Sequence, residues 1–226
     1  MISLPERTKI PKKQVVYEPH KRGNSTFFER LSLSTKDKQD LRRQIARLTI
    51  THTIDTRTTN IPAGTTVQQL VVMRVELLTD KLDKELLAQF DMRVKFYPIF
   101  VLVYPDAREE LLVHYKEGLS HEIDGRVFKI LKTFASSDDV SLYFEGNNLD
   151  EVYDNLVKDV GQSELIAPNV DNLKEAIDKT EQLAKLEKEA NSLKKKMFQE
   201  KSTKKAMELR KAYKTLLTQI KEIKGE

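Results

Sequence analysis

The chain has no cysteine among its 226 residues. Disulfide bonds and thiolate metal sites are therefore excluded, and a reducing compartment suits the sequence. No stretch approaches the roughly 20 consecutive apolar residues that a membrane-spanning helix needs. The opening segment, MISLPERTKIPKK, has no apolar run behind its charges, so we expect no secretory signal. Together these absences predict a cytoplasmic protein of bacterial type that does not enter the membrane.

Motifs of the common catalytic centres are missing as well. Gly64 and Gly118 stand alone, so they form no glycine-rich phosphate loop. His114 and His121 are seven residues apart, and neither this spacing nor the surroundings of His52 resemble a zinc motif. No arrangement of serine, histidine and aspartate can be argued from spacing. We therefore expect no bound metal, no cofactor and no working catalytic centre.

Charge is unevenly distributed along the sequence. Residues 1–57 carry 13 Lys/Arg against six Asp/Glu, residues 58–170 carry 11 against 19, and residues 171–226 carry 15 against ten. Two basic ends therefore enclose an acidic middle. This layout indicates surfaces that face polyanions or acidic partners, or ends that contact the acidic middle of a neighbouring subunit.

Apolar patterns predict a small sheet. Leu48–Ile54 alternates threonine with mainly bulkier side chains, as a half-buried strand does. Val67–Leu78 is nearly continuously apolar, which is typical of a central strand buried on both faces. Three further strands are expected, the last of them after an Asp124-Gly125 turn: Ile99–Tyr104, Leu111–Tyr115 and Val127–Leu131.

Helices are expected to flank this sheet. Leu41, Ile45 and Leu48 recur at the spacing of one helix face. A second helix is predicted from about Asp80 to Phe90. The third spans Leu149–Val160, with Asn148 as its N-cap and Glu151 in the capping-box position.

The sequence changes character after Ala167-Pro168-Asn169. No glycine or proline follows Val170 until Gly225, and apolar residues recur at heptad spacing in two stretches, Leu183–Met197 and Ala206–Ile223. The two phases do not join, and a polar segment lies between them. We therefore predict two helices folded back as an antiparallel hairpin, with one continuous helix containing a phase slip as the alternative.

The predicted fold class is α/β (α+β), a small mixed sheet with flanking helices followed by a C-terminal antiparallel helical hairpin. The expected divisions are an extended basic N-terminal arm over residues 1–23, an α/β domain over 24–167 and the coiled-coil hairpin over 168–226. Three prolines and few bulky apolar residues underlie the prediction for the arm, which a disordered tail would explain equally well.

One catalytic hypothesis can be tied to named residues. A magnesium-dependent nuclease of the restriction type needs an aspartate followed by a strand bearing Glu-x-Lys. Asp55 ends one predicted strand and Glu76 lies on the next, but Leu78 occupies the lysine position. The alternatives are a nuclease with a degenerate centre or a Glu76 that faces solvent or pairs with a cation.

Two groups of residues are candidates for binding macromolecules. A basic N-terminal group could neutralise nucleic-acid phosphates or simply form a solvated charged face: Lys12, Lys13, Arg42, Arg43 and Arg47. The hairpin's apolar stripes are candidates for partner binding: Leu183, Leu186, Leu193, Met197, Leu209, Tyr213, Leu216 and Ile220.

Several segments taken in order resemble one bacterial family. They are LPERTKIPKK at residues 4–13, YPIF at 97–100, NNLDEVY at 147–153 and EKSTKKAMEL at 200–209. The chain is similar over nearly its whole length to the uncharacterised family called domain of unknown function 4391. The resemblance implies no catalytic residues. It implies a role beside DNA-processing enzymes, because genes of the family often lie near helicase and DNA methyltransferase genes in restriction-like, antiphage settings.

The sequence thus favours a non-catalytic accessory or docking subunit of a DNA-directed defence complex. Its protein partner would be of the helicase or DNA methyltransferase class, and its own contact with nucleic acid would be weak. The alternatives are the nuclease that uses Asp55 and Glu76 and a structural homo-oligomer built through the coiled coil.

Overall fold

The computed structural model describes residues 4–19, 29, 31–137, 144–162, 164–165, 173–200 and 202–224. The chain divides into two compact units, residues 1–161 and 162–226, which are described separately below. The expected boundary at Ala167-Pro168-Asn169 lies outside the described residues, as do residues 20–23 of the predicted arm.

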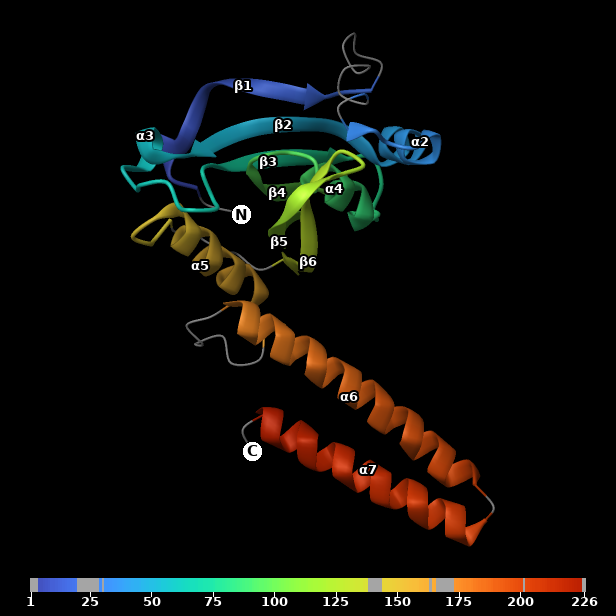
Figure 1. Cartoon of the computed structure of the whole chain (residues 1–226). Coiled ribbons are helices and arrows are strands. Elements are labelled where there is room, and N and C mark those ends of the chain that lie inside the picture. The colour runs from blue at the N-terminus through green and yellow to red at the C-terminus, as the bar shows by residue number, and fades with distance from the viewer. Residues whose placement is uncertain are drawn as a thin grey trace. The chain divides into compact units, whose positions relative to one another are not determined.

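A six-stranded mixed sheet forms the first unit, which will be called the sheet unit (Figure 1). Its strands are β1 (Lys9–Tyr17), β2 (Ile45–Ile54), β3 (Leu70–Leu77), β4 (Tyr97–Val103), β5 (Glu109–Ile123) and β6 (Arg126–Ser136). They neighbour one another in chain order, and every pair is antiparallel except β3 and β4. A parallel pair needs a crossover, which here contains α4 (Lys84–Asp91). The predicted mixed sheet is confirmed.

The two faces of the sheet have different covers. On one face, Val71, Met73 and Val75 of β3 share a core with Leu41 of α2 (Thr35–Gln44) and with residues of α4. Because strand side chains alternate, Leu70 and its β4 partner Tyr97 point to the opposite face. There Tyr97 packs edge-on against Tyr153 of α5 (Leu149–Gly161), with ring centroids 4.8 Å apart. The sheet is therefore buried on both faces in its centre, as its apolar strands predict.

The first predicted helix is shorter than expected. α2 ends at Gln44, and β2 starts at Ile45, so the expected helix face through Ile45 and Leu48 is wrong. The pairing of β2 with β3 shifts register between Ile45 and Arg47. Such a bulge lets Ile45 and Leu48, three residues apart, reach the same core. An irregular strand has therefore produced a spacing that looks helical in the sequence.

The predicted cap of α5 is present and is part of a larger junction. Glu151 N–H donates to Asn148 Oδ1 at 3.0 Å, and Asn148 Nδ2 donates back to Glu151 Oε1 at 3.4 Å. The neighbouring Asp150 accepts from the backbone N–H groups of a loop before β3, at 2.7 Å from Thr65 and 2.6 Å from Val67. Gly64 is required here, because a Cβ at this position would stand 2.3 Å from Asp150 Cγ.

Two long helices form the described part of the second unit (Figure 1). α6 (Leu173–Gln199) and α7 (Thr203–Lys224) fold back on each other, and Leu183, Ala190 and Ile220 are buried between them. Partly buried side chains from both helices extend this seam: Leu186, Tyr213, Leu216 and Ile223. The predicted antiparallel hairpin is confirmed, and the alternative of one continuous helix is excluded. Within the described residues, neither this hairpin nor any other helix has the length and apolar content needed to cross a membrane.

Candidate functional site

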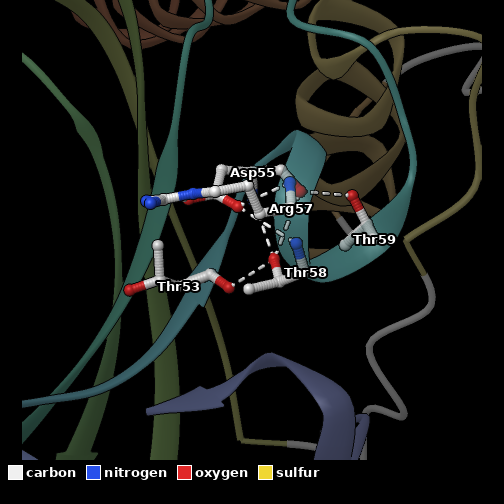
Figure 2. Close-up of polar contacts among 5 residues, drawn as sticks. All are labelled: Thr53, Asp55, Arg57, Thr58 and Thr59. Carbon is white, nitrogen blue, oxygen red and sulfur yellow. Dashed lines mark hydrogen bonds and ion pairs between the residues drawn. The ribbon is translucent and has the colours of Figure 1, made fainter.

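Asp55, the first residue of the nuclease hypothesis, caps the short helix α3 (Thr56–Thr59). Figure 2 shows its carboxylate among the backbone groups of that helix, where it accepts from the N–H of Arg57 at 2.9 Å and of Thr58 at 3.1 Å. The Thr58 hydroxyl returns the interaction by accepting from Asp55 N–H at 3.0 Å. Burial acts to raise the pKa of Asp55, but the hydrogen bonds from Thr58 and Arg57 outweigh it and lower the pKa. Asp55 thus serves as a helix cap.

Glu76 lies far from this cap. The β2–β3 register pairs Ile54 with Leu70 but Arg47 with Glu76, so the two carboxylates are at opposite ends of the strand pair. Six residues of strand correspond to about 20 Å. Glu76 instead lies 3.8 Å from Arg47 Nη1 and 3.7 Å from Arg74 Nε. The structure does not bring the two acids into one site, and no group of three or more His, Asp or Glu that could hold a metal occurs in the described part of the chain.

The basic N-terminal group is divided over three elements. Lys12 and Lys13 are exposed on β1, which is one of the two edge strands of the sheet. Arg42 and Arg43 are exposed on α2, whereas Arg47 of β2 is engaged by Glu18 at 2.6 Å. Lys13 also lines a cleft of about 250 Å³, together with Leu4, Lys9, Thr51, His52, Arg74, Val101 and Glu109. The lysines remain available to phosphates, and nucleic-acid binding by the group stays a prediction.

The most unusual chemistry of the sheet unit is a buried polar cluster that sequence reasoning missed. The cluster consists of Asp91 at the end of α4 and of His114 and Lys116 on β5. Each of the three residues is at most 4% exposed. Lys116 Nζ donates to Asp91 Oδ1 and, at 2.9 Å, to the carbonyl oxygen of Phe96. His114 Nδ1 lies 2.8 Å from the other Asp91 oxygen. The available signal was that two basic side chains, His114 and Lys116, stand two residues apart in the mostly apolar segment 111–116.

Aromatic rings surround the lysine of this cluster. Its Nζ lies 4.5 Å from the ring centroid of Tyr97 and 4.0 Å from that of Phe128, within the range of cation–π contacts. Burial lowers the pKa of Lys116, and the charge of Asp91 opposes that shift. The cluster ties β5 to the end of α4 and to the segment before β4.

A polar cleft of about 470 Å³ adjoins the cluster. Its lining residues are Thr66, Val67, Tyr97, Tyr115, Lys116, Glu117, Gly118, Asp150, Tyr153 and Asp154. The Tyr97 hydroxyl is buried and has no hydrogen-bond partner in the described structure, whereas Tyr153 donates to the carbonyl oxygen of His114. Burial raises the pKa of Asp154 to about 6. The cleft is therefore lined by a half-buried carboxyl group whose pKa is raised, while the two tyrosine hydroxyls beside it are buried.

The pKa of Asp154 predicts how the stability of the sheet unit depends on pH. A carboxyl whose pKa rises from 3.8 to about 6 on folding binds its proton more tightly in the folded state, so stability should fall as pH rises through that window. Asp154→Asn should flatten this part of the profile, as measured by urea unfolding at about pH 4.5 and about pH 7. Asp178→Asn, on an exposed position of α6, removes the same charge and should leave the slope unchanged. An Asp154→Asn protein that keeps the full slope would contradict the assignment.

The apolar residues predicted for partner binding are used within the chain. Five of the eight belong to the hairpin seam: Leu183, Leu186, Tyr213, Leu216 and Ile220. The remaining three, Leu193, Met197 and Leu209, are half-buried. The apolar stripes of α6 and α7 therefore pack against each other, and any partner must bind to residues outside this seam.

These features define a two-unit α+β protein, in which a mixed sheet unit precedes a helical hairpin. The chain belongs to the family described as Domain of unknown function (DUF4391), whose model matches residues 2–220. The family membership expected from the sequence is thereby confirmed over nearly the whole chain. No curated protein and no solved structure matches the chain.

Proposed function

We propose that the protein is a non-catalytic accessory subunit that docks onto a DNA-processing enzyme. The observation that carries this proposal is the hairpin of α6 and α7, whose large apolar seam residues pack against one another while most other positions are exposed. Helices of 27 and 22 residues extend for about 40 Å and about 33 Å. A solvent-exposed helix pair of this length is suited to contacting another macromolecule rather than to enclosing a small substrate.

The partner class follows from the family resemblance, which favours a helicase or DNA methyltransferase in a restriction-like, antiphage setting. Such a complex would work in the cytoplasm. The exposed Lys12 and Lys13 support an additional weak contact with nucleic-acid phosphates, indifferent to sequence and reduced by salt. The separation of Asp55 and Glu76 along the β2–β3 pair gives no geometric support to the nuclease alternative, so we do not propose it.

Co-expression with the helicase and the methyltransferase encoded nearest to its gene tests the proposal. Size-exclusion chromatography with light scattering should show a complex of fixed stoichiometry with one of them. If the chain runs alone in every pairing, the accessory role fails. If it instead forms a homo-oligomer of fixed size that excludes both enzymes, the structural homo-oligomer replaces it.

A further inference from the structure

The two sides of the hairpin can be told apart from its register. We assign heptad position a to Leu183 in α6 and to Ala206 in α7. With this assignment, the seam residues occupy positions a and d of both helices. In an antiparallel pair, the e positions of the two helices adjoin on one side and the g positions on the other. Glu187 and Lys224 are both e positions, and their ion pair of 2.9 Å joins the two helices on that side.

We call the side formed by the b and e positions the Glu187–Lys224 flank. Its members are Leu173, Ile177, Thr180, Ala184, Glu187, Asn191, Lys194 and Phe198 of α6, with Thr203, Met207, Arg210, Lys214, Leu217, Lys221 and Lys224 of α7. The opposite flank consists of the c and g positions: Glu175, Asp178, Gln182, Lys185, Glu189, Ser192, Lys196 and Gln199 of α6, with Lys205, Glu208, Ala212, Thr215, Gln219 and Glu222 of α7.

Exposed apolar side chains gather on one flank only. Within the described hairpin, the large hydrophobic residues that are exposed are Phe198 at 75%, Met207 at 69% and Leu217 at 37%. All three occupy b or e positions of the Glu187–Lys224 flank. Leu217, at an e position, adjoins the seam, whereas Phe198 and Met207, at b positions, lie farther from it. The helical rise separates Met207 from Leu217 by about 15 Å along α7.

The two flanks also differ in charge, and the flank with the exposed apolar residues is the basic one. The Glu187–Lys224 flank carries five Lys/Arg against one acid, whereas the opposite flank carries three Lys against five acids. One acid near the start of α6, Glu175, pairs with Lys179 at 2.8 Å. In the described structure, Lys194, Arg210, Lys214 and Lys221 of the Glu187–Lys224 flank have no carboxylate partner within ion-pair distance. Unpaired cations and wet apolar groups therefore share one surface.

We propose that this flank binds an acidic amphipathic helix of the partner protein, laid along the groove between α6 and α7 as a third helix. The inference rests on the proposed docking function and names the surface and the partner's chemistry. Apolar residues of the partner would cover Phe198, Met207 and Leu217, and its Asp or Glu residues would face the cations on either side. Because apolar and charged contacts alternate along one line, a helix satisfies both at once.

Other occupants fit the flank less well. A second copy placed flank to flank would bring two surfaces of the same positive sign together. A nucleic-acid strand would neutralise the cations, and Phe198 could stack on a base, but phosphates leave Met207 and Leu217 exposed to water. The aliphatic part of the flank therefore favours a protein helix.

Peptide binding to the full-length protein tests the inference. The probe is a dye-labelled peptide of three heptads with Leu at a and d and Glu at e and g, and its control has Lys at every Glu position. We expect the Glu peptide to bind at least about tenfold more tightly than the Lys peptide, as read by fluorescence anisotropy. Met207→Ser with Leu217→Ser should weaken the Glu peptide by about tenfold or more.

Charge reversal supplies the matched control. Lys214→Glu with Lys221→Glu should weaken the Glu peptide and strengthen the Lys peptide, whereas Lys185→Glu with Lys196→Glu on the opposite flank should leave both within about twofold. The inference is overturned if the two peptides bind alike, if the opposite-flank variant loses as much, or if a single-stranded DNA oligonucleotide binds while the Glu peptide does not.

The enzyme complex separates this inference from the proposed function. If the complex with the helicase or methyltransferase survives the Met207→Ser, Leu217→Ser variant, the accessory role stands and the flank is not its docking surface. If that variant abolishes a complex that the opposite-flank variant keeps, both are supported. If no complex forms at all, the accessory role fails, and the peptides still decide what the flank binds.

Discussion

Lys116→Met should lower the free energy of unfolding of the sheet unit by about 3–5 kcal/mol. The substitution keeps most of the apolar stem but removes the cation from Asp91, which is fully buried. An uncompensated carboxylate in the interior is costly, and His114 at 2.8 Å is the one other side chain that Asp91 contacts in the described hydrogen-bond network. The carbonyl oxygen of Phe96 would also lose its donor at 2.9 Å.

Urea unfolding followed by tyrosine near-ultraviolet circular dichroism measures this change. Six of the seven tyrosines precede residue 162, so the signal reports mainly on the sheet unit. Lys129→Met, at an exposed position of β6, is the matched control and should cost no more than about 0.5 kcal/mol. If Lys116→Met and Lys129→Met unfold alike, the Lys116–Asp91 pair does not stabilise the fold.

A double substitution separates the effect of charge from that of packing. Asp91→Leu combined with Lys116→Met removes both charges of the buried pair, and such replacements are often neutral or stabilising. The double variant should therefore be more stable than Lys116→Met alone. If the loss of stability in the double variant equals the sum of the losses in Asp91→Leu and Lys116→Met, the destabilisation comes from altered packing and not from the unpaired charge.

The buried cluster also shows where sequence reasoning stops. Apolar periodicity identified β3, β4 and the heptad stripes, because burial imposes its period directly on the sequence. It could not identify Lys116 as buried, because lysine is nearly always exposed unless a partner compensates its charge. That partner, Asp91, lies 25 positions away on a helix, and only the crossover from β3 to β4 brings it there.

Asp55 and Glu76 illustrate a second limit. Their place on successive strands could be predicted, but their separation depended on the direction of the second strand. Because β2 and β3 are antiparallel, the end of one strand lies beside the start of the next, and Glu76 near the end of β3 is brought to Arg47. The prediction of a helix through Ile45 was wrong for a related reason. The bulge in β2 places buried residues three positions apart, which is also the spacing of a helix face.

Leu186→Asp should open the hairpin while leaving the sheet unit folded. Leu186 packs on the seam formed by Leu183, Ala190 and Ile220. Two of these three side chains are large, and each is worth about 1.5–3 kcal/mol when buried. The seam of two helices therefore has little stability to lose. Replacing Leu186 removes its apolar contacts and places a carboxylate in the seam, at a cost of about 2–3 kcal/mol.

Hydrogen exchange resolved by peptide mass spectrometry separates the two units in the intact chain. Protection in α6 and α7 should fall by about 30- to 150-fold, which is the exchange equivalent of that loss, while peptides of β3 and β4 keep their protection. Association with the partner, or with a second copy, should disappear together with the hairpin. Ser192→Asp places the same charge on an exposed position of α6 and should change neither protection nor association. A Leu186→Asp protein with normal protection of α6 would show that the apolar contacts of Leu186 do not hold the two helices together, because a charge placed among them would then have no effect on the hairpin.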